Sequence, residues 1–137
     1  MSRKWSIRAA AALTVPAVVF GTSTPAFAGD TWVSLVNSYT GVAAMQHVDD
    51  GDKFRVYDQL KDGRGAKGYL YVWISPTDRS LIATKYNGNG AGTYTEFQYN
   101  VLEGLTYSMV ICSVTSSGDN SMSRCAPNVW PGKTFTE

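Results

Sequence analysis

The chain has 137 residues, of which 44% are hydrophobic and 17% are charged, with a formal net charge of +1. This length suits one domain of ordinary size, and a near-neutral charge without a basic cluster argues against nucleic-acid binding. No apolar run reaches the roughly 18 residues of a membrane-spanning helix, so we expect no membrane span.

The first 28 residues have the composition of a secretory leader. Three basic residues occur within the first eight positions, an apolar run follows at 9–20, and an Ala-Phe-Ala sequence ends at Ala28. We therefore predict a signal peptide at 1–28, a single β domain at 29–137 and a secreted, extracellular protein. The leader holds three of the 12 Lys and Arg residues and none of the 11 Asp and Glu residues, so the mature chain has a formal charge of −2.

Hydrophobic and polar residues alternate with a period of two through the mature chain, which predicts β-strands separated by Gly, Asn, Asp and Ser. No segment keeps an apolar 3.6-residue period for three turns, so no helix is expected. We predict an all-β fold, a small antiparallel sandwich or barrel of about seven short strands, and sequence does not separate these two architectures. The polar C-terminal PGKTFTE is expected to fray, with Phe135 suited to docking. The strand candidates are 31–36, 42–45, 54–57, 69–75, 80–86, 93–101, 105–114 and 121–130.

Two glycine-rich segments carry the strongest turn signals. DQLKDGRGAKG, residues 58–68, lies between two alternating runs, so we predict a hairpin connection in which Gly63 and Gly65 supply unusual φ angles and Arg64 lies at the tip. NGNGAG, residues 87–92, contains the Asn-Gly pairs that suit tight turns.

Cys112 and Cys125 are the only cysteines. An even number of cysteines in a secreted chain predicts a disulfide, which here would join the strands on either side of SSGDN. One histidine and no further thiol make no zinc set. Closing a loop of about 14 residues is expected to stabilise the fold by roughly 3 kcal/mol.

The order GDKFRVYD, KDG, GAKGYLYV, EGLTYSMVICSV and SRC resembles a group of small secreted actinobacterial proteins. Members of that group pair a D…DG segment with an EG strand that contains a cysteine and with a second cysteine nearby. The resemblance implies a compact extracellular β domain. The group has no established activity, so the resemblance implies no mechanism. The matching positions here are Asp58, Asp62, Gly63, Glu103, Gly104, Cys112 and Cys125.

Signals for catalysis are weak. His47 lies near no serine motif, so a surface or partly buried strand-end histidine is favoured over a triad member. Glu96 and Glu103 are candidates for a carboxylate pair, but Glu96 alternates like a solvent-facing strand residue and Glu103 precedes a turn glycine. We therefore predict no catalytic residues and no cofactor.

Two acidic clusters, 49–52 and 58–62, are candidates for calcium loops. Neither has the ligand spacing of a calcium loop, both contain turn residues, and lysines and Arg64 lie nearby. The turn interpretation is therefore preferred, and no metal site is predicted.

An aromatic stripe is the best hint of a binding surface. If Leu70 and its alternating neighbours Val72 and Ile74 face the core, the rings of Tyr69, Tyr71 and Trp73 share the opposite face. Exposed aromatic rings stack on sugars and peptides. The alternative is that this strand is covered on both sides, or that the rings pair across strands.

The predicted function is a secreted, non-catalytic binding module for an extracellular polysaccharide or protein. One version recognises polysaccharide through the aromatic stripe. The alternative is a small inhibitor that blocks an extracellular hydrolase with a protruding loop, either the Arg64 tip or residues 87–92. A small hydrolase is the third hypothesis, which lacks an acid and base constellation.

Overall fold

The computed structural model describes residues 29–128 and 132–137, so the predicted signal peptide lies outside the described residues. The described chain is all-β, as predicted, and contains no helix that is long and apolar enough to cross a bilayer. Its nine strands are β1 (Thr31–Asn37), β2 (Thr40–Val48), β3 (Lys53–Asp58), β4 (Gly65–Ser75), β5 (Asp78–Asn87), β6 (Thr93–Gln98), β7 (Thr106–Val114), β8 (Cys125–Ala126) and β9 (Lys133–Thr136).

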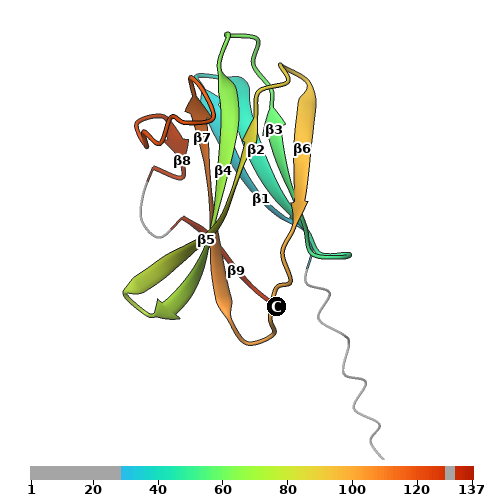
Figure 1. The fold of residues 1–137 in the computed structure, drawn as a ribbon, viewed down its shortest axis with the longest axis vertical. Helices are drawn as coiled ribbons and strands as arrows, with labels where there is room; N and C mark the ends of the chain where they lie inside the picture. The colour runs from blue at the N-terminus through green and yellow to red at the C-terminus, as the bar shows by residue number, and fades with distance from the viewer. Residues whose placement is uncertain (1–28, 129–131) are drawn as a thin grey trace, which may run out of the picture.

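The strands form two antiparallel sheets that face each other, so the fold is a sandwich (Figure 1). Sheet A has the order β1-β2-β3-β6, and sheet B has the order β5-β4-β7-β8, with β9 also paired to β7. Seven strands occur where the alternation predicts them. The last predicted strand, 121–130, was too long: within its described part, 121–128, only β8 pairs with β7.

The segment 58–68 is not a hairpin, and that prediction was wrong. β3 pairs with β2 and β6, whereas β4 pairs with β5 and β7, so the chain crosses from sheet A to sheet B here. A short connection of turn residues is compatible with either geometry, and the partner strands lie far away in sequence. The turn chemistry itself is present, since the Arg64 amide donates to Asp62 Oδ1 at 3.0 Å.

The core lies between the inward faces of the two sheets. Met45, Phe54 and Val56 of sheet A are fully buried, as are Leu70, Met109 and Ile111 of sheet B. Gly68 lets the sheets approach, because a Cβ there would lie 2.7 Å from Val56 Cγ2 and 2.8 Å from Met45 Sδ.

Residues 133–136 do not fray, in contrast to one part of the prediction, whereas the expected docking of Phe135 is confirmed. β9 pairs with β7, and the Phe135 ring stacks on His47 at 4.6 Å and on Tyr107 at 5.6 Å between centroids. This contact buries His47 to 3% exposure, so a surface position for this histidine was also wrong. The apolar ring and the edge of β7 together outweigh the polar composition of the segment.

The predicted disulfide is confirmed: Cys112 of β7 and Cys125 of β8 are bonded and lie opposite each other. The segment between them, 115–124, folds back over the outer face of sheet B. Lys67, which is 6% exposed, anchors it by donating Nζ hydrogen bonds to Ser117 O at 2.9 Å and Asn120 Oδ1 at 2.7 Å. A buried ammonium needs several acceptors, and the segment supplies them.

Asp119 organises the same segment. Its carboxylate accepts hydrogen bonds from the Thr115 amide at 2.9 Å, the Thr115 hydroxyl at 3.0 Å and the Ser121 amide at 2.9 Å. These donors favour the ionised form and hold the pKa of Asp119 well below its usual range.

Because the pKa of Asp119 is lower in the folded state, its contribution to stability is present at neutral pH and is lost as pH falls below about 4. We expect Asp119→Asn to lower the urea midpoint at pH 7, with a difference from wild type that shrinks progressively at lower pH. Urea titrations of both proteins from pH 7 to pH 3 measure this. An equal difference at every pH would contradict a role for the charge.

Candidate functional site

The predicted stripe Tyr69, Tyr71, Trp73 does not form one exposed surface. Tyr69 is 4% exposed and packs with Val110 and Cys112 beneath the 115–124 segment. Burial raises the pKa of its hydroxyl. At Tyr69, therefore, β4 is covered on both faces, which is the alternative to an exposed stripe.

Tyr71 is half-buried because Arg79 lies over it. The guanidinium carbon is 3.8 Å from the centroid of the Tyr71 ring, and Arg79 Nη1 donates to Ser108 Oγ at 3.3 Å. Desolvation in this position lowers the pKa of Arg79. One ring face of Tyr71 is thus occupied by a cation from the neighbouring strand.

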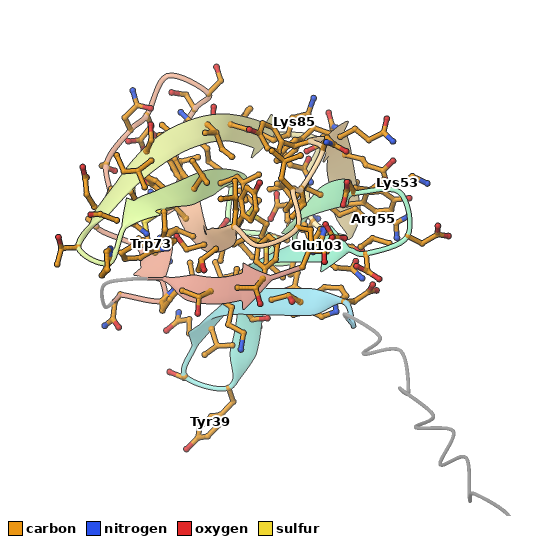
Figure 2. The ribbon with its side chains drawn as sticks, turned by 90° about the horizontal axis from the view of Figure 1, so that it is seen from below. Tyr39, Lys53, Arg55, Trp73, Lys85 and Glu103 are labelled. Atoms are coloured by element: carbon orange, nitrogen blue, oxygen red, sulfur yellow. A yellow bond between two sulfur atoms is a disulfide. The ribbon has the colours of Figure 1, made fainter. Side chains whose placement is uncertain are left out.

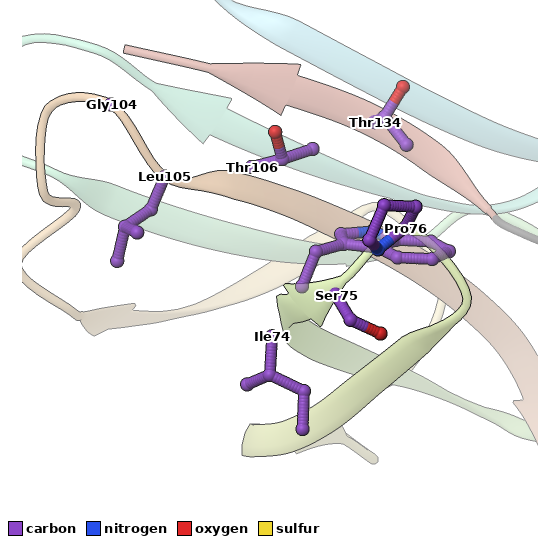
Figure 3. Close-up of a pocket in the computed structure, with 8 residues that line it drawn as sticks. Ile74, Ser75, Pro76, Gly104, Leu105, Thr106 and Thr134 are labelled. Atoms are coloured by element: carbon purple, nitrogen blue, oxygen red, sulfur yellow. The ribbon is translucent and has the colours of Figure 1, made fainter.

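Trp73 lines an open apolar cleft of about 450 Å³ at the end of the sandwich where the paired strands β4 and β5 extend away from the other strands (Figures 1 and 3). Ile74 and Leu105 are exposed there, at 65% and 38%. The expectation that Ile74 faces the core was wrong, because β4 continues past the edge of the opposite sheet. Figure 3 shows the other walls, which are the turn at Pro76, the start of β7 and Thr134 of β9.

Arg64 is not a protruding tip. Its Nε donates to Ser113 Oγ and its Nη2 to Ser113 O, both at 2.9 Å, so the side chain folds back onto β7. Among the large hydrophobic residues that the structure describes, the most exposed is Tyr39, in the turn between β1 and β2, which projects away from the sandwich in Figure 2. Tyr39 is fully exposed.

A second aromatic group, not predicted as a site, lies on the outer face of sheet A. We call Trp32, Tyr57 and Tyr94 the sheet A platform. Trp32 and Tyr57 stack with ring centroids 5.4 Å apart, and Tyr57 and Tyr94 follow at 5.2 Å. Trp32 is 46% exposed and Tyr94 is 50% exposed, so the two ends of the row face solvent.

Strand register brings the platform together. Tyr57 lies directly opposite Tyr94 on one side and Ala44 on the other, and Trp32 pairs with Gln46 one pleat along β2. Ala44, which lies opposite Tyr57, is 1% exposed. A small residue on β2 between two aromatic strands lets Trp32 and Tyr57 make contact across it.

Polar side chains flank the platform. Tyr57 donates its hydroxyl to Gln46 Oε1 at 2.8 Å, and Gln46 Nε2 donates to Asp30 Oδ2 at 2.8 Å. Arg55 bonds Glu96 through Nε at 2.8 Å, and its guanidinium lies 5.0 Å from the centre of the Tyr94 ring. The bond to Glu96 raises the pKa of Arg55.

The candidate catalytic groups have structural partners. Glu96 is the ion-pair partner of Arg55. His47 Nε2 lies 3.6 Å from Asp52 Oδ1, and Asp52 Oδ2 accepts the Val101 amide at 3.0 Å. Within residues 29–128 and 132–137, no group of three or more His, Cys, Asp or Glu side chains is arranged to hold a metal ion.

No family model, no curated protein and no solved structure matches the chain. The fold therefore defines the class on its own: a disulfide-bonded antiparallel β-sandwich. A disulfide is typical of proteins from oxidising compartments. The sheet A platform and the Trp73 cleft both have features of binding sites. Figure 2 shows Arg55, beside the platform, and Trp73 on opposite sides of the molecule.

Proposed function

We propose that the protein is an extracellular, non-catalytic module that binds polysaccharide through the sheet A platform. The observation that carries this proposal is the row of three aromatic rings across one sheet face, with Trp32 and Tyr94 about half exposed. Large exposed aromatic groups on a monomer usually mark a contact surface. The predicted leader and the disulfide support a location outside the cell.

The chemistry of the platform suits a sugar chain. Aromatic rings offer apolar surface to the C–H groups of a pyranose at little cost in side-chain entropy. Arg55 and Glu96, which are 30% and 37% exposed at their side chains, stand beside Tyr94 and supply donors and acceptors for hydroxyl groups. A row that crosses strands provides successive contacts, which suits a polymer better than a single small molecule.

The test is retention of the secreted protein on insoluble chitin, cellulose and peptidoglycan. We expect the parent protein to bind at least one of them, and Trp32→Ala/Tyr94→Ala to bind at least tenfold more weakly, a loss of about 1.4 kcal/mol or more. Trp73→Ala is the matched control, because it removes the same type of ring from the Trp73 cleft. Urea midpoints show that each variant is folded.

Absence of retention on all three polymers would overturn the proposal, and so would a double variant that binds like the parent. The inhibitor hypothesis predicts a different outcome. Because Arg64 is bonded to Ser113, the exposed loop 88–92 and the exposed turn at Tyr39 are the elements that would enter a hydrolase cleft. Hydrolase inhibition that Tyr39→Ala abolishes, without polymer retention, would favour that alternative.

A further inference from the structure

The two glycine-rich segments singled out by sequence come together at one end of the sandwich. The loop 59–64 after β3 and the loop 88–92 after β5 lie beside each other at the top of Figure 1. The Gly92 amide donates to Asp58 O at 2.8 Å and joins them. Between them is a pocket of about 330 Å³, which we call the loop pocket. It is lined by Asp58, Leu60, Lys61, Asp62, Gly63, Arg64, Gly65, Tyr86, Gly88, Gly90 and Ala91.

Asp58 is the unusual group in the loop pocket. It follows Phe54 and Val56 on the inner face of β3 and is 3% exposed. Among the described residues, its Oδ2 atom is buried and has no hydrogen-bond partner. Burial, with the nearby charge of Asp62, raises the pKa of Asp58. A buried carboxylate oxygen without a partner destabilises the fold. Asp58 also lines the pocket, so a ligand that donates a hydrogen bond to its carboxyl group would reduce this cost.

The walls of the pocket are held in place by the fold. A Cβ at Gly65 would lie 2.5 Å from Tyr86 Cε2, and one at Gly88 would lie 2.6 Å from Tyr86 Cε1, so these glycines leave room for the ring. Asn87, which is fully buried, donates Nδ2 to Val56 O and Thr93 O and fixes the second loop. The pocket is therefore formed before any ligand arrives.

The charges of the pocket argue for a neutral ligand. Asp58 and Asp62 are offset by Lys61 and Arg64, which also line it. A simple cation would meet these two basic side chains, and an anion would meet the buried carboxyl group. A molecule with several hydroxyl groups donates to Asp58 and accepts from lysine or backbone amides without a net charge.

We propose that the loop pocket binds one unit of a neutral saccharide, with a ligand hydroxyl donating a hydrogen bond to the carboxyl group of Asp58. The choice of sugars as ligand rests on the proposed function. The residues involved are separate from the sheet A platform, so the pocket would recognise a chain end or a free sugar while the platform holds the chain.

Amide chemical-shift titrations with glucose, N-acetylglucosamine and their β-1,4-linked disaccharides test this proposal. We expect saturable shifts at Gly63, Gly88 and Gly90 with at least one sugar. Asp58→Asn keeps the shape of the side chain and should weaken binding at least tenfold. Ala91→Trp places a large ring in the pocket from an exposed position and leaves Asp58 unmutated, and it should abolish sugar binding.

The platform variant Trp32→Ala/Tyr94→Ala separates the two proposals. Loop-pocket shifts that persist in this variant support the pocket, whether or not the protein is retained on polymers. The saccharide proposal would be overturned in favour of a cation if the protein binds calcium or putrescine saturably but no sugar, and if Asp58→Asn abolishes that binding. Absence of saturable shifts with every sugar at tens of millimolar would overturn the site, even if polymer retention through the platform is found.

Discussion

Replacing both Cys112 and Cys125 by alanine is expected to lower the free energy of unfolding by roughly 3 kcal/mol. The bond closes a loop with a sequence separation of 13 residues, and the chain-entropy model assigns about this stabilisation to a loop of that size. For a domain whose total stability is about 5–15 kcal/mol, this is a large fraction. Urea unfolding of the variant and of the reduced parent protein measures it, and the two should agree.

The sandwich itself should survive removal of the disulfide, because β7 keeps its long pairing with β4. The 115–124 segment should loosen, so hydrogen exchange at the Ser113 amide, which donates to Arg124 O at 2.8 Å, should become faster. Ser123→Ala is a suitable control, since it changes an exposed side chain in the same segment. If the free energy of unfolding falls by less than about 1 kcal/mol, the segment between the two cysteine positions is already ordered in the unfolded chain without the disulfide.

Asn87→Ala is expected to lower the free energy of unfolding by roughly 3 kcal/mol, because it leaves buried backbone groups without partners. The amide donates to Val56 O at 3.1 Å and Thr93 O at 2.9 Å, and its Oδ1 accepts the Asn89 amide at 3.1 Å. This one side chain therefore joins β3 to the loop that precedes β6. Thermal and urea unfolding measure the loss.

Asn87→Asp sharpens the same test. It keeps the size of the side chain but replaces the Nδ2 donor by an oxygen that faces two carbonyl groups, so it should destabilise the protein at least as much as alanine at pH 7. Asn89→Ala, on the exposed side of the same loop, should change stability by no more than about 0.5 kcal/mol. A tolerated aspartate would mean that the hydrogen-bond direction at Asn87 does not matter.

The extent to which the sequence predicted this protein differs between elements. Period-two alternation locates β1 to β7, because each strand has one face against the core. The disulfide was predictable because the chain has two cysteines. Phe135 was the one apolar signal in the C-terminal segment, and its contact with His47 and Tyr107 outweighs the polar residues around it.

The binding surfaces were less predictable. Alternation shows that the side chains of Tyr69 and Trp73 project from the same face of β4, but it does not show which other residues cover that face. Lys67 and the 115–124 segment cover Tyr69, and this contact joins positions about 50 residues apart. Conversely, Trp32 and Tyr94 gave no combined signal, because nothing local indicates that β1 and β6 belong to one sheet.

The sequence by itself determined the strands, the disulfide, the turn chemistry of the glycine-rich loops and the absence of a helical period. These are local properties, set by side-chain alternation, by φ preferences and by the count of cysteines. Only the tertiary structure decided which strands pair, that residues 58–68 cross between sheets, and which aromatic rings reach solvent. Those depend on contacts between distant segments, and a short glycine-rich connection fits either arrangement until the strands have found their partners.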